Sequence, residues 1–504
     1  MNIYHPILVA VFPILFFYSQ NQDELRPGVV GEPLGLAIGI ALVVWLAASL
    51  VYRSMGKGSL MTTLLLGWFF FYGHVTYVLR DIFIPIGGVV LGPDKILFPT
   101  SIGLVVFLGF LISKKAYKPE GVNGWLNWCL AILTIIQLVT ILPRERVISQ
   151  VEKMPDKDRG QATSGPDVYF LVLDAYARGD VLQQIYEYDN SQFLDELKQV
   201  GMVVVDDARS NYSQTFFSLA ATLNMEHVNN LKEDPGAGVS VPLRMIGENQ
   251  VARKFKENGY RVINLASGWE VTDNLPVADI NYNEAGTFKI FGRSISVNEF
   301  LIVFIKTTAL SPFVDRVLAD QARAKVLYAF AKLEEIPYQR GRKFVIGHFN
   351  VPHPPYLFDQ NGDPIPNQLL ELAGESFSDR ANYLKQLEFV SQKTLEVIRA
   401  IINNSDQPPI IILQSDHGPA SILGHPYKWT RPAVRDGVME RMSILSAYFL
   451  PMGVDTSLVP KTPVNTFRFI FNEYFGDKYK MLEETSYFSD YNSIFEFFEV
   501  EVFD

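Results

Sequence analysis

Residues 410–418 read Ile-Ile-Ile-Leu-Gln-Ser-Asp-His-Gly, so a carboxylate (Asp416) and an imidazole (His417) directly follow an apolar run. The β-branched residues of this run predict a central strand that is buried on both faces. A second apolar run, at 168–173, also ends on a carboxylate, Asp174. In open α/β sheets, ligands bind just beyond the carboxyl ends of such strands. The two runs together indicate a site for a divalent cation.

Beyond residue 165, predicted strands and helices alternate, which is typical of a mainly parallel sheet with helices on both faces. We expect strands at 168–173, 202–206, 261–265, 343–349, 409–415 and 444–450. We expect helices at 179–199, 215–225, 247–258, 295–308, 314–334, 379–403 and 464–474. The pattern predicts an α/β domain whose central sheet lies between helices.

The first 142 residues have the composition of a membrane domain. They predict an N-terminal all-α transmembrane bundle of about five helices. A cleaved signal peptide is the alternative for the first apolar stretch, but that stretch lacks a basic leader and an Ala-x-Ala-like end. The apolar stretches of near-spanning length lie at 3–19, 34–52, 60–79, 97–113 and 124–142.

Basic residues predict the orientation, because short cytoplasmic loops retain Lys and Arg. Two loops carry them, one with Arg53 and Lys57 and one with Lys114, Lys115 and Lys118. With these loops inside, five spans place the rest of the chain outside. We therefore predict a multi-pass protein of the cell inner membrane or plasma membrane, with an extracytoplasmic C-terminal domain.

The predicted domains are a transmembrane domain at 1–142, a linker at 143–165 and the large domain at 166–504. The single cysteine, Cys129, lies in the fifth apolar stretch, so the large domain has no internal disulfide. The net charge of −10 argues against a nucleic-acid partner, for which a basic stripe is expected.

Thr215 opens the segment Thr-Phe-Phe-Ser-Leu-Ala-Ala-Thr-Leu, for which we expect a helix. A hydroxyl at a helix N-terminus lies near free backbone N–H groups and the positive end of the helix dipole. Both stabilise an alkoxide and an incoming phosphate oxygen. The alternative is that Thr215 or Ser213 only caps the helix, and the local sequence leaves both open.

Several motifs between residues 166 and 451 resemble, in their order, the alkaline phosphatase superfamily in its sulfatase-like branch. A membrane anchor followed by an exported domain is similar to lipoteichoic acid synthases and phosphoethanolamine transferases. The resemblance implies an alkaline-phosphatase-like fold and an enzyme. The motifs are the strand ending in Asp174, the block 215–221, Lys-Glu-Asn-Gly-Tyr at 256–260, His-Phe-Asn-Val-Pro-His-Pro-Pro-Tyr at 348–356 and Ser-Asp-His-Gly at 415–418.

The resemblance implies one divalent cation bound by Asp174, Asp416, His417 and the hydroxyl of Thr215, with Thr215 also the nucleophile. A bound cation activates the hydroxyl and offsets the negative charge of a phosphate. Mixed oxygen and nitrogen ligands suit Mn²⁺ or Zn²⁺, and Mg²⁺ is a further candidate.

Three histidines are candidates for substrate binding. The resemblance implies that His353 is also catalytic and either binds the phosphate or protonates the leaving alcohol; the alternative is that it anchors a loop. For His348, a structural role in the strand and a role in substrate binding are equally consistent with the sequence. His425 lies on a loop that can fold over the metal.

Three departures from the family patterns narrow the function. Thr215 stands where sulfatases have a Cys or Ser that becomes formylglycine, and Leu219 stands where they have Arg, so sulfate-ester hydrolysis is not expected. Asp174 stands where the lipoteichoic acid and phosphoethanolamine enzymes typically have Glu, which leaves the transferred group open. No second metal-ligand set surrounds Asp416, which favours a single cation.

The predicted function is a metal-dependent transferase acting through a phospho-threonine intermediate. It moves a phosphoglycerol- or phosphoethanolamine-like group from a membrane phospholipid donor to a glycan or lipid acceptor of the cell envelope. Envelope polysaccharide machinery is a further candidate partner. Two alternatives stay open: a phosphodiesterase or phosphatase of the same superfamily, and a non-catalytic envelope binding protein.

Overall fold

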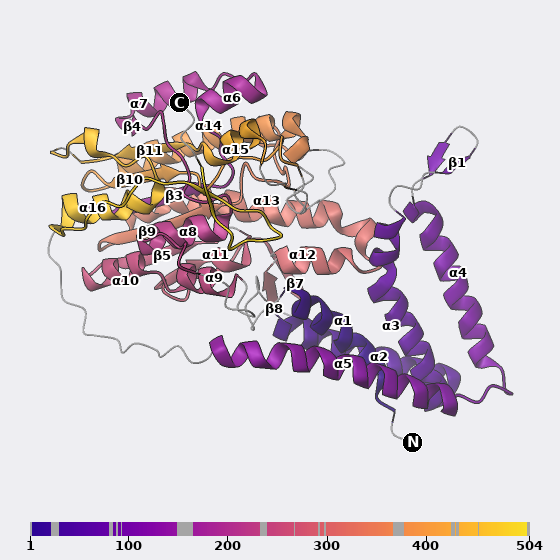
Figure 1. Ribbon diagram of the computed structural model, residues 1–504. Coiled ribbons are helices and arrows are strands. Elements are labelled where there is room, and N and C mark those ends of the chain that lie inside the picture. The colour runs from indigo at the N-terminus through magenta and orange to yellow at the C-terminus, as the bar shows by residue number, and fades with distance from the viewer. Residues whose placement is uncertain are drawn as a thin grey trace. The chain divides into compact units, whose positions relative to one another are not determined.

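The chain divides into two compact units, which the computed structural model shows in Figure 1. The helical unit comprises Met1–Met154 and Phe300–Asp315, and the sheet unit comprises Pro155–Glu299 and Arg316–Asp504. The residues that the structure describes are 3–21, 30–79, 84–86, 89–91, 93–148, 165–231, 239–266, 268–290, 293–296, 299–365, 377–424, 429, 433–451 and 453–500.

The contacts group Phe300–Asp315 with the N-terminal helices, although this segment falls inside the large domain expected at 166–504. Most of the expected linker, residues 149–164, lies outside the described residues. The domain boundaries therefore stay a prediction.

Five helices occur at the positions of the five apolar stretches: α1 (His5–Asn21), α2 (Gly31–Tyr52), α3 (Met55–Val78), α4 (Pro93–Ser113) and α5 (Glu120–Ile148). Within the described residues, three of them are long and apolar enough to cross a membrane: α2, α4 and the Glu120–Ile141 part of α5. The helix α1 has 17 residues, fewer than the roughly 20 that a span needs. A span for each of the five helices stays a prediction. A short hairpin of β1 (Ile84–Ile86) and β2 (Val89–Leu91) joins α3 to α4.

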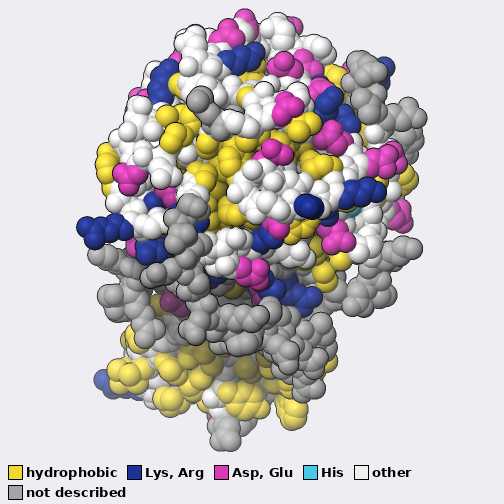
Figure 2. Space-filling view, turned by 90° about the vertical axis from the view of Figure 1, so that its left-hand side faces the viewer, with side chains coloured by type: hydrophobic (Ala, Val, Ile, Leu, Met, Phe, Trp, Pro, Cys, Tyr) yellow, Lys and Arg dark blue, Asp and Glu magenta, His cyan; other side chains and the backbone are white. Residues whose placement is uncertain are grey.

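The helical unit exposes large hydrophobic side chains. Val43, Leu46 and Val106 each leave more than 60% of their surface uncovered. Hydrophobic side chains also gather on the face of this unit that Figure 2 shows. Apolar surface of this extent is costly in water and is typical of helices that contact lipid.

A seven-stranded sheet forms the centre of the sheet unit, and Figure 1 shows its strands in succession. Within this described sheet, β11 alone runs antiparallel to its neighbours. The mainly parallel sheet is thus confirmed, and β6 is an addition to the six expected strands. In spatial order the strands are β4 (Met202–Val204), β11 (Ser446–Phe449), β10 (Ile410–Gln414), β3 (Val168–Leu173), β9 (Lys343–Phe349), β5 (Arg261–Leu265) and β6 (Ile280–Tyr282).

Helices cover both faces of the sheet. On one face, alternate residues of β3 and β10 join a hydrophobic core with α8 (Thr215–Asn224), α9 (Ser240–Gly247), α10 (Gln250–Glu257) and α16 (Thr466–Phe475). Phe255 of α10 stacks on Phe344 of β9, with ring centroids 4.2 Å apart. On the other face, Phe330 of α13 (Ser311–Glu335) stacks on Phe349 at 4.4 Å. This layering explains why β3, and β10 up to Leu413, consist of apolar and aromatic residues.

The remaining helices are α6 (Gly179–Tyr186), α7 (Ser191–Gln199), α11 (Glu270–Asp273), α12 (Glu299–Lys306), α14 (Arg380–Asn404) and α15 (Arg435–Met442). The remaining strands are β7 (Thr287–Ile290), β8 (Arg293–Ser296), β12 (Tyr487–Phe488) and β13 (Phe498–Glu499). The single helix expected at 179–199 is two helices, because Glu187 adopts a left-handed conformation with φ 54° and ends α6. Asp189 then accepts a hydrogen bond from the amide of Ser191 at the start of α7.

Candidate metal centre and active site

The two strand ends singled out by the sequence lie side by side. β10 pairs in parallel with β3, so Asp416 and His417 leave the sheet beside Asp174. On the other side of β3, His348 of β9 pairs with Val172. Because parallel strands end at one edge of a sheet, the four side chains converge there.

Thr215 is the first residue of α8 and faces this cluster. Its Oγ1 lies 2.9 Å from Nε2 of His417. The side chain of Ser218, on the same helix, donates a hydrogen bond of 2.6 Å to the carbonyl oxygen of Asp416 and so connects α8 to the loop that follows β10. Thr215 is partly exposed, whereas Asp416 and His417 are buried. Thr215 is therefore the least buried residue of the cluster.

The helix-capping alternative for Thr215 and Ser213 does not hold in the structure. The N-cap residue of α8 is Gln214, whose side chain makes no capping hydrogen bond. The hydroxyl of Ser213 instead donates to the carbonyl oxygen of Ser489, 2.9 Å away. The Thr215 hydroxyl is directed to His417 and not to the amides of the first turn.

The separations within the cluster suit ligands of one cation. Nε2 of His417 lies 3.3 Å from a carboxylate oxygen of Asp416 and 3.6 Å from one of Asp174. Two ligands about 2.0–2.2 Å from a tetrahedral cation lie about 3.3–3.6 Å apart. The site residues predicted for the metal, Asp174, Thr215, Asp416 and His417, are thus brought together, and their roles stay a prediction.

Unsatisfied oxygens give a second reason to expect a cation. Oδ1 of Asp174 and both carboxylate oxygens of Asp416 are buried and have no hydrogen-bond partner among the described residues. A buried carboxylate without compensation costs several kcal/mol. A divalent cation satisfies all three oxygens at once, so the residues present fit it.

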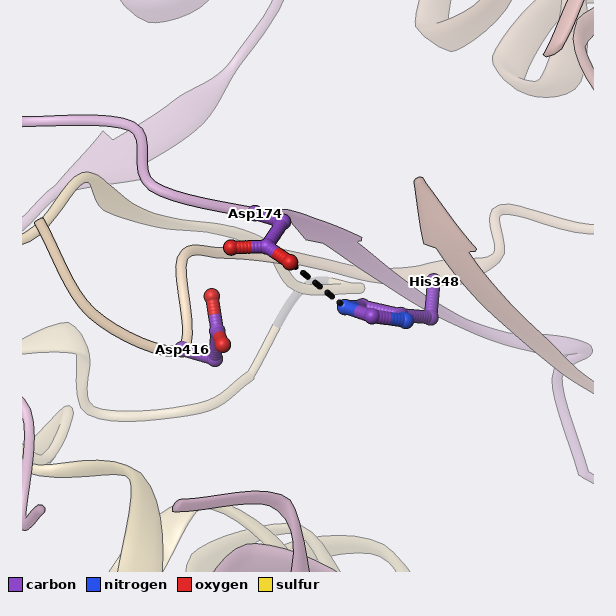
Figure 3. A group of neighbouring side chains, drawn as sticks. All are labelled: Asp174, His348 and Asp416. Atoms are coloured by element: carbon purple, nitrogen blue, oxygen red, sulfur yellow. Dashed lines mark ion pairs between the residues drawn. The ribbon is translucent and has the colours of Figure 1, made fainter. Parts of the chain in front are cut away.

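His348 also faces the carboxylates, as Figure 3 shows. Its Nε2 lies 3.6 Å from Oδ2 of Asp174, and its Nδ1 lies 3.1 Å from Oγ1 of Thr272, which orients the ring. Asp174, His348 and Asp416 each offer one ligand atom within 4.8 Å of the others. His348 therefore lies as close to the candidate metal centre as the predicted ligands do, although the sequence suggested only substrate binding or a structural role.

The two carboxyl groups of the cluster, Asp416 and Asp174, have pKa values shifted in opposite directions. Burial, together with the negative charge of Asp174, raises the pKa of Asp416 to about 7. Burial also raises the pKa of Asp174, but the positive charges that His353, His348 and His417 carry when protonated outweigh it and hold that pKa below its usual value. When two carboxyl groups share a site, the repulsion between their negative charges moves their pKa values apart. A bound cation stabilises the ionised form of both groups.

Burial and the nearby positive charge of Arg441 lower the pKa of His417 well below its ordinary value. The imidazole is therefore neutral at neutral pH, which is the form that binds a metal.

His353 follows β9 and lies next to the cluster. Its amide donates a hydrogen bond of 3.1 Å to the carbonyl oxygen of Asp174. Its ring centroid lies 6.3 Å from that of His417. Nδ1 lies 2.5 Å from the carbonyl oxygen of Pro354, so Nδ1 carries a proton and Nε2 of the neutral ring is a proton acceptor. Burial lowers the pKa of His353 and favours that neutral form. The third histidine, His425, lies outside the described residues.

Arg441 of α15 is a component of the site that sequence reasoning missed. Its guanidinium is buried; Nε donates to the carbonyl oxygen of Ser213 at 2.7 Å and Nη1 to that of Gly418 at 2.8 Å. One planar group thus joins the loop before Thr215 to the loop after His417. No motif signals this role, because it depends on two carbonyl oxygens from distant parts of the chain.

A family model described as Sulfatase matches residues 166–438, which is more than half of the chain. No curated protein sequence matches the chain.

Several solved structures are similar. The C-terminal periplasmic domain of EcEptC from Escherichia coli is 14% identical, with 66% of this chain and 95% of that chain covered and a TM-score of 0.41. The integral membrane lipooligosaccharide phosphoethanolamine transferase A (EptA) from Neisseria meningitidis is 12% identical, with 92% and 94% covered and a TM-score of 0.38. The phosphonate monoester hydrolase of Agrobacterium radiobacter is 12% identical, with 64% and 80% covered and a TM-score of 0.40.

Proposed function

The chain belongs to the sulfatase family, and from this premise we propose that it is a membrane-anchored, metal-dependent transferase. It moves a phosphoglycerol- or phosphoethanolamine-like group from a membrane phospholipid to a glycan or lipid of the cell envelope. The intermediate is a phospho-threonine at Thr215. Membership of this family agrees with the expectation of an enzyme from the sulfatase-like branch. We propose the lipid donor, the envelope acceptor and the phospho-threonine intermediate in addition.

One observation carries the proposal: Thr215, a partly exposed residue at a helix N-terminus, places its hydroxyl 2.9 Å from a buried imidazole that also adjoins two carboxylates. The free amides at the start of α8 favour a phosphate at this position. Asp174, Asp416, His417 and the Thr215 hydroxyl would hold Mn²⁺ or Zn²⁺, with His348 beside them. When bound, such a cation activates the hydroxyl and offsets the charge of the phosphate.

The two half-reactions need no reactant besides the lipid donor, Thr215 and the acceptor. In the first half-reaction, Oγ1 of Thr215 bonds to phosphorus, the bond from phosphorus to the lipid alcohol breaks, and the proton of Thr215 ends on that alcohol. In the second, the acceptor hydroxyl bonds to phosphorus, Thr215 leaves, and the acceptor's proton returns to it. Neutral His353, with Nε2 as acceptor, is suited to receive and return this proton.

We further propose that five spans anchor the protein in the inner or plasma membrane and place the catalytic domain outside the cytoplasm. The basic loops at Arg53 and Lys57 and at Lys114 to Lys118 support this orientation. The exposed hydrophobic faces of the helical unit support the anchor.

A trapped adduct tests the proposal. We expect protein incubated with phosphatidylethanolamine or phosphatidylglycerol to gain the mass of the transferred group on the peptide that contains Thr215. Thr215→Ala should show neither the adduct nor turnover. The control Thr222→Ser, in the same helix, should keep both. Full activity of Thr215→Ala, or an adduct on another residue, would end the proposal.

Dependence on the acceptor separates the alternatives. A transferase needs a glycan or lipid hydroxyl for continued turnover, whereas a phosphodiesterase or phosphatase needs only water. A purified protein that binds no metal and forms no adduct would instead support a non-catalytic binding role.

A further inference from the structure

A segment from the C-terminal part of the chain is built into the helical unit. Phe304 of α12 joins a buried hydrophobic cluster with residues of α1, α2 and α3. Phe300 lies one turn earlier, and its ring centroid is 5.3 Å from that of Phe17 in α1. The segment Phe300–Asp315 is therefore a fixed part of this unit.

Backbone hydrogen bonds join the same segment to one turn of α3. The amide of Gly73 donates to the carbonyl oxygen of Thr307 at 2.9 Å, and the amide of Ala309 donates to that of Phe69 at 2.7 Å. A Cβ atom at Gly73 would lie 2.1 Å from the carbonyl oxygen of Lys306, so a side chain here would force the segment away. Gly73 thus permits a close approach that no other residue allows.

This approach creates a groove between α1, α3 and the turn after α12. The groove has a volume of about 210 Å³ and is lined mainly by aromatic side chains. This is less than the roughly 300–1,000 Å³ of sites that enclose a whole small molecule. The lining includes Phe12, Phe16 and Phe17 of α1, Phe71 and His74 of α3, and Thr307.

The lining suits a hydrocarbon chain with a polar group at its end. Phe16 and Phe71 leave 41% and 44% of their surfaces exposed, so an acyl chain lying in the groove would contact both rings. His74 is exposed at the groove and makes no hydrogen bond within the described part of the chain. Its ring N–H is available to an ester or phosphate oxygen, groups that border the acyl chains of a phospholipid.

We propose that this groove binds one acyl chain of the phospholipid donor, with His74 at the end nearer the head group. The proposal rests on the proposed function, since it assigns the donor a place in the helical unit. His74 lies near the end of α3 that the proposed orientation places outside. The donor would accordingly come from the outer leaflet of the membrane.

Photo-crosslinking tests the site without reference to turnover. The full chain is placed in phosphatidylcholine nanodiscs with phosphatidylethanolamine or phosphatidylglycerol that carries a diazirine in one acyl chain. We expect label on the peptides that contain Phe16, Phe71 or Thr307, and less label when the diazirine is on phosphatidylcholine. Equal labelling by all three lipids, or label spread evenly over α4 and α5, would overturn the proposal.

Variants give the matching functional test. Phe71→Gln should lower turnover of the lipid donor, relative to turnover of the soluble diester bis(p-nitrophenyl) phosphate, by about tenfold. The control Phe107→Gln replaces an exposed phenylalanine of α4 outside the groove and should leave this ratio unchanged. An unchanged ratio for Phe71→Gln would contradict the groove. Absence of turnover of both substrates by the unmodified protein would instead contradict the proposed function and leave the crosslinking result standing.

Discussion

Asp416 and Glu440 are both buried carboxylates of the sheet unit, but their surroundings are opposite. Glu440 accepts hydrogen bonds from the amides of Ser421 and Ile422, each 2.9 Å long, and from the hydroxyls of Ser421 and Tyr186. Neither oxygen of Asp416 has a hydrogen-bond partner among the described residues. We therefore expect Glu440 to stabilise the fold, whereas the unsatisfied oxygens of Asp416 suit a cation.

The replacement Asp416→Asn should have the largest effect on activity. Loss of a metal ligand should lower turnover by about 10³-fold or more, because a bound cation contributes several kcal/mol to the transition state. The melting temperature of the metal-free protein should stay the same or rise, since an unpaired buried charge is removed. A markedly lower melting temperature would show that Asp416 stabilises the fold as Glu440 does.

Metal removal should have the next largest effect. A chelator should lower turnover of the unmodified protein by up to about 10³-fold. It should also lower the melting temperature, because a cation at 100 times its Kd contributes about 2.7 kcal/mol to stability. Zn²⁺ or Mn²⁺ should restore both. The melting temperature of Asp416→Asn should respond much less to the chelator. An equal response of the two proteins would place the metal elsewhere.

Arg441→Lys should lower kcat by about 10²-fold, because one ammonium group cannot hold both the Ser213 and the Gly418 carbonyl oxygens as the guanidinium does. Metal affinity, measured by titration, should change little. Arg399→Lys is the matched control, since Arg399 lies at the surface and pairs only with Glu196 among the described carboxylates. Similar kcat values for the two variants would show that Arg441 does not position the site.

Glu440→Gln should have the smallest effect on turnover and should act on stability instead. We expect a loss of about 2–3 kcal/mol, because hydrogen bonds to a charged acceptor weaken. Turnover per folded molecule and the response to a chelator should be unchanged. The control Glu396→Gln, which alters an exposed ion pair with Lys393, should leave the melting temperature nearly unchanged. A loss of metal binding in Glu440→Gln would remove the distinction between the two carboxylates.

The parts of the site that follow strand ends could be predicted from the sequence. The strands expected at 168–173 and 409–415 match β3 and β10 to within one residue at each end, since strands buried on both faces are mostly apolar. Parallel pairing then brings Asp174, Asp416 and His417 together. The helix expected to start at Thr215 does start there, although its N-cap is Gln214 and not the Ser or Thr that the local pattern suggested.

Other features depend on contacts between distant segments, which no local pattern contains. His348 faces Asp174 only because β9 lies beside β3. Arg441 donates hydrogen bonds to two backbone carbonyl oxygens. Every residue has such an oxygen, so the sequence does not show which ones Arg441 contacts. The helix expected at 295–308 exists as α12, but its packing on α1 and α3 follows from Phe300 and Phe304, which read as ordinary core residues.

Anomalous diffraction at the absorption edges of zinc and manganese would locate the cation. We expect one peak within coordination distance of Asp174, Asp416, His417 and the Oγ1 atom of Thr215. The absence of a peak at this sheet edge, or a cation bound away from Thr215, would contradict it.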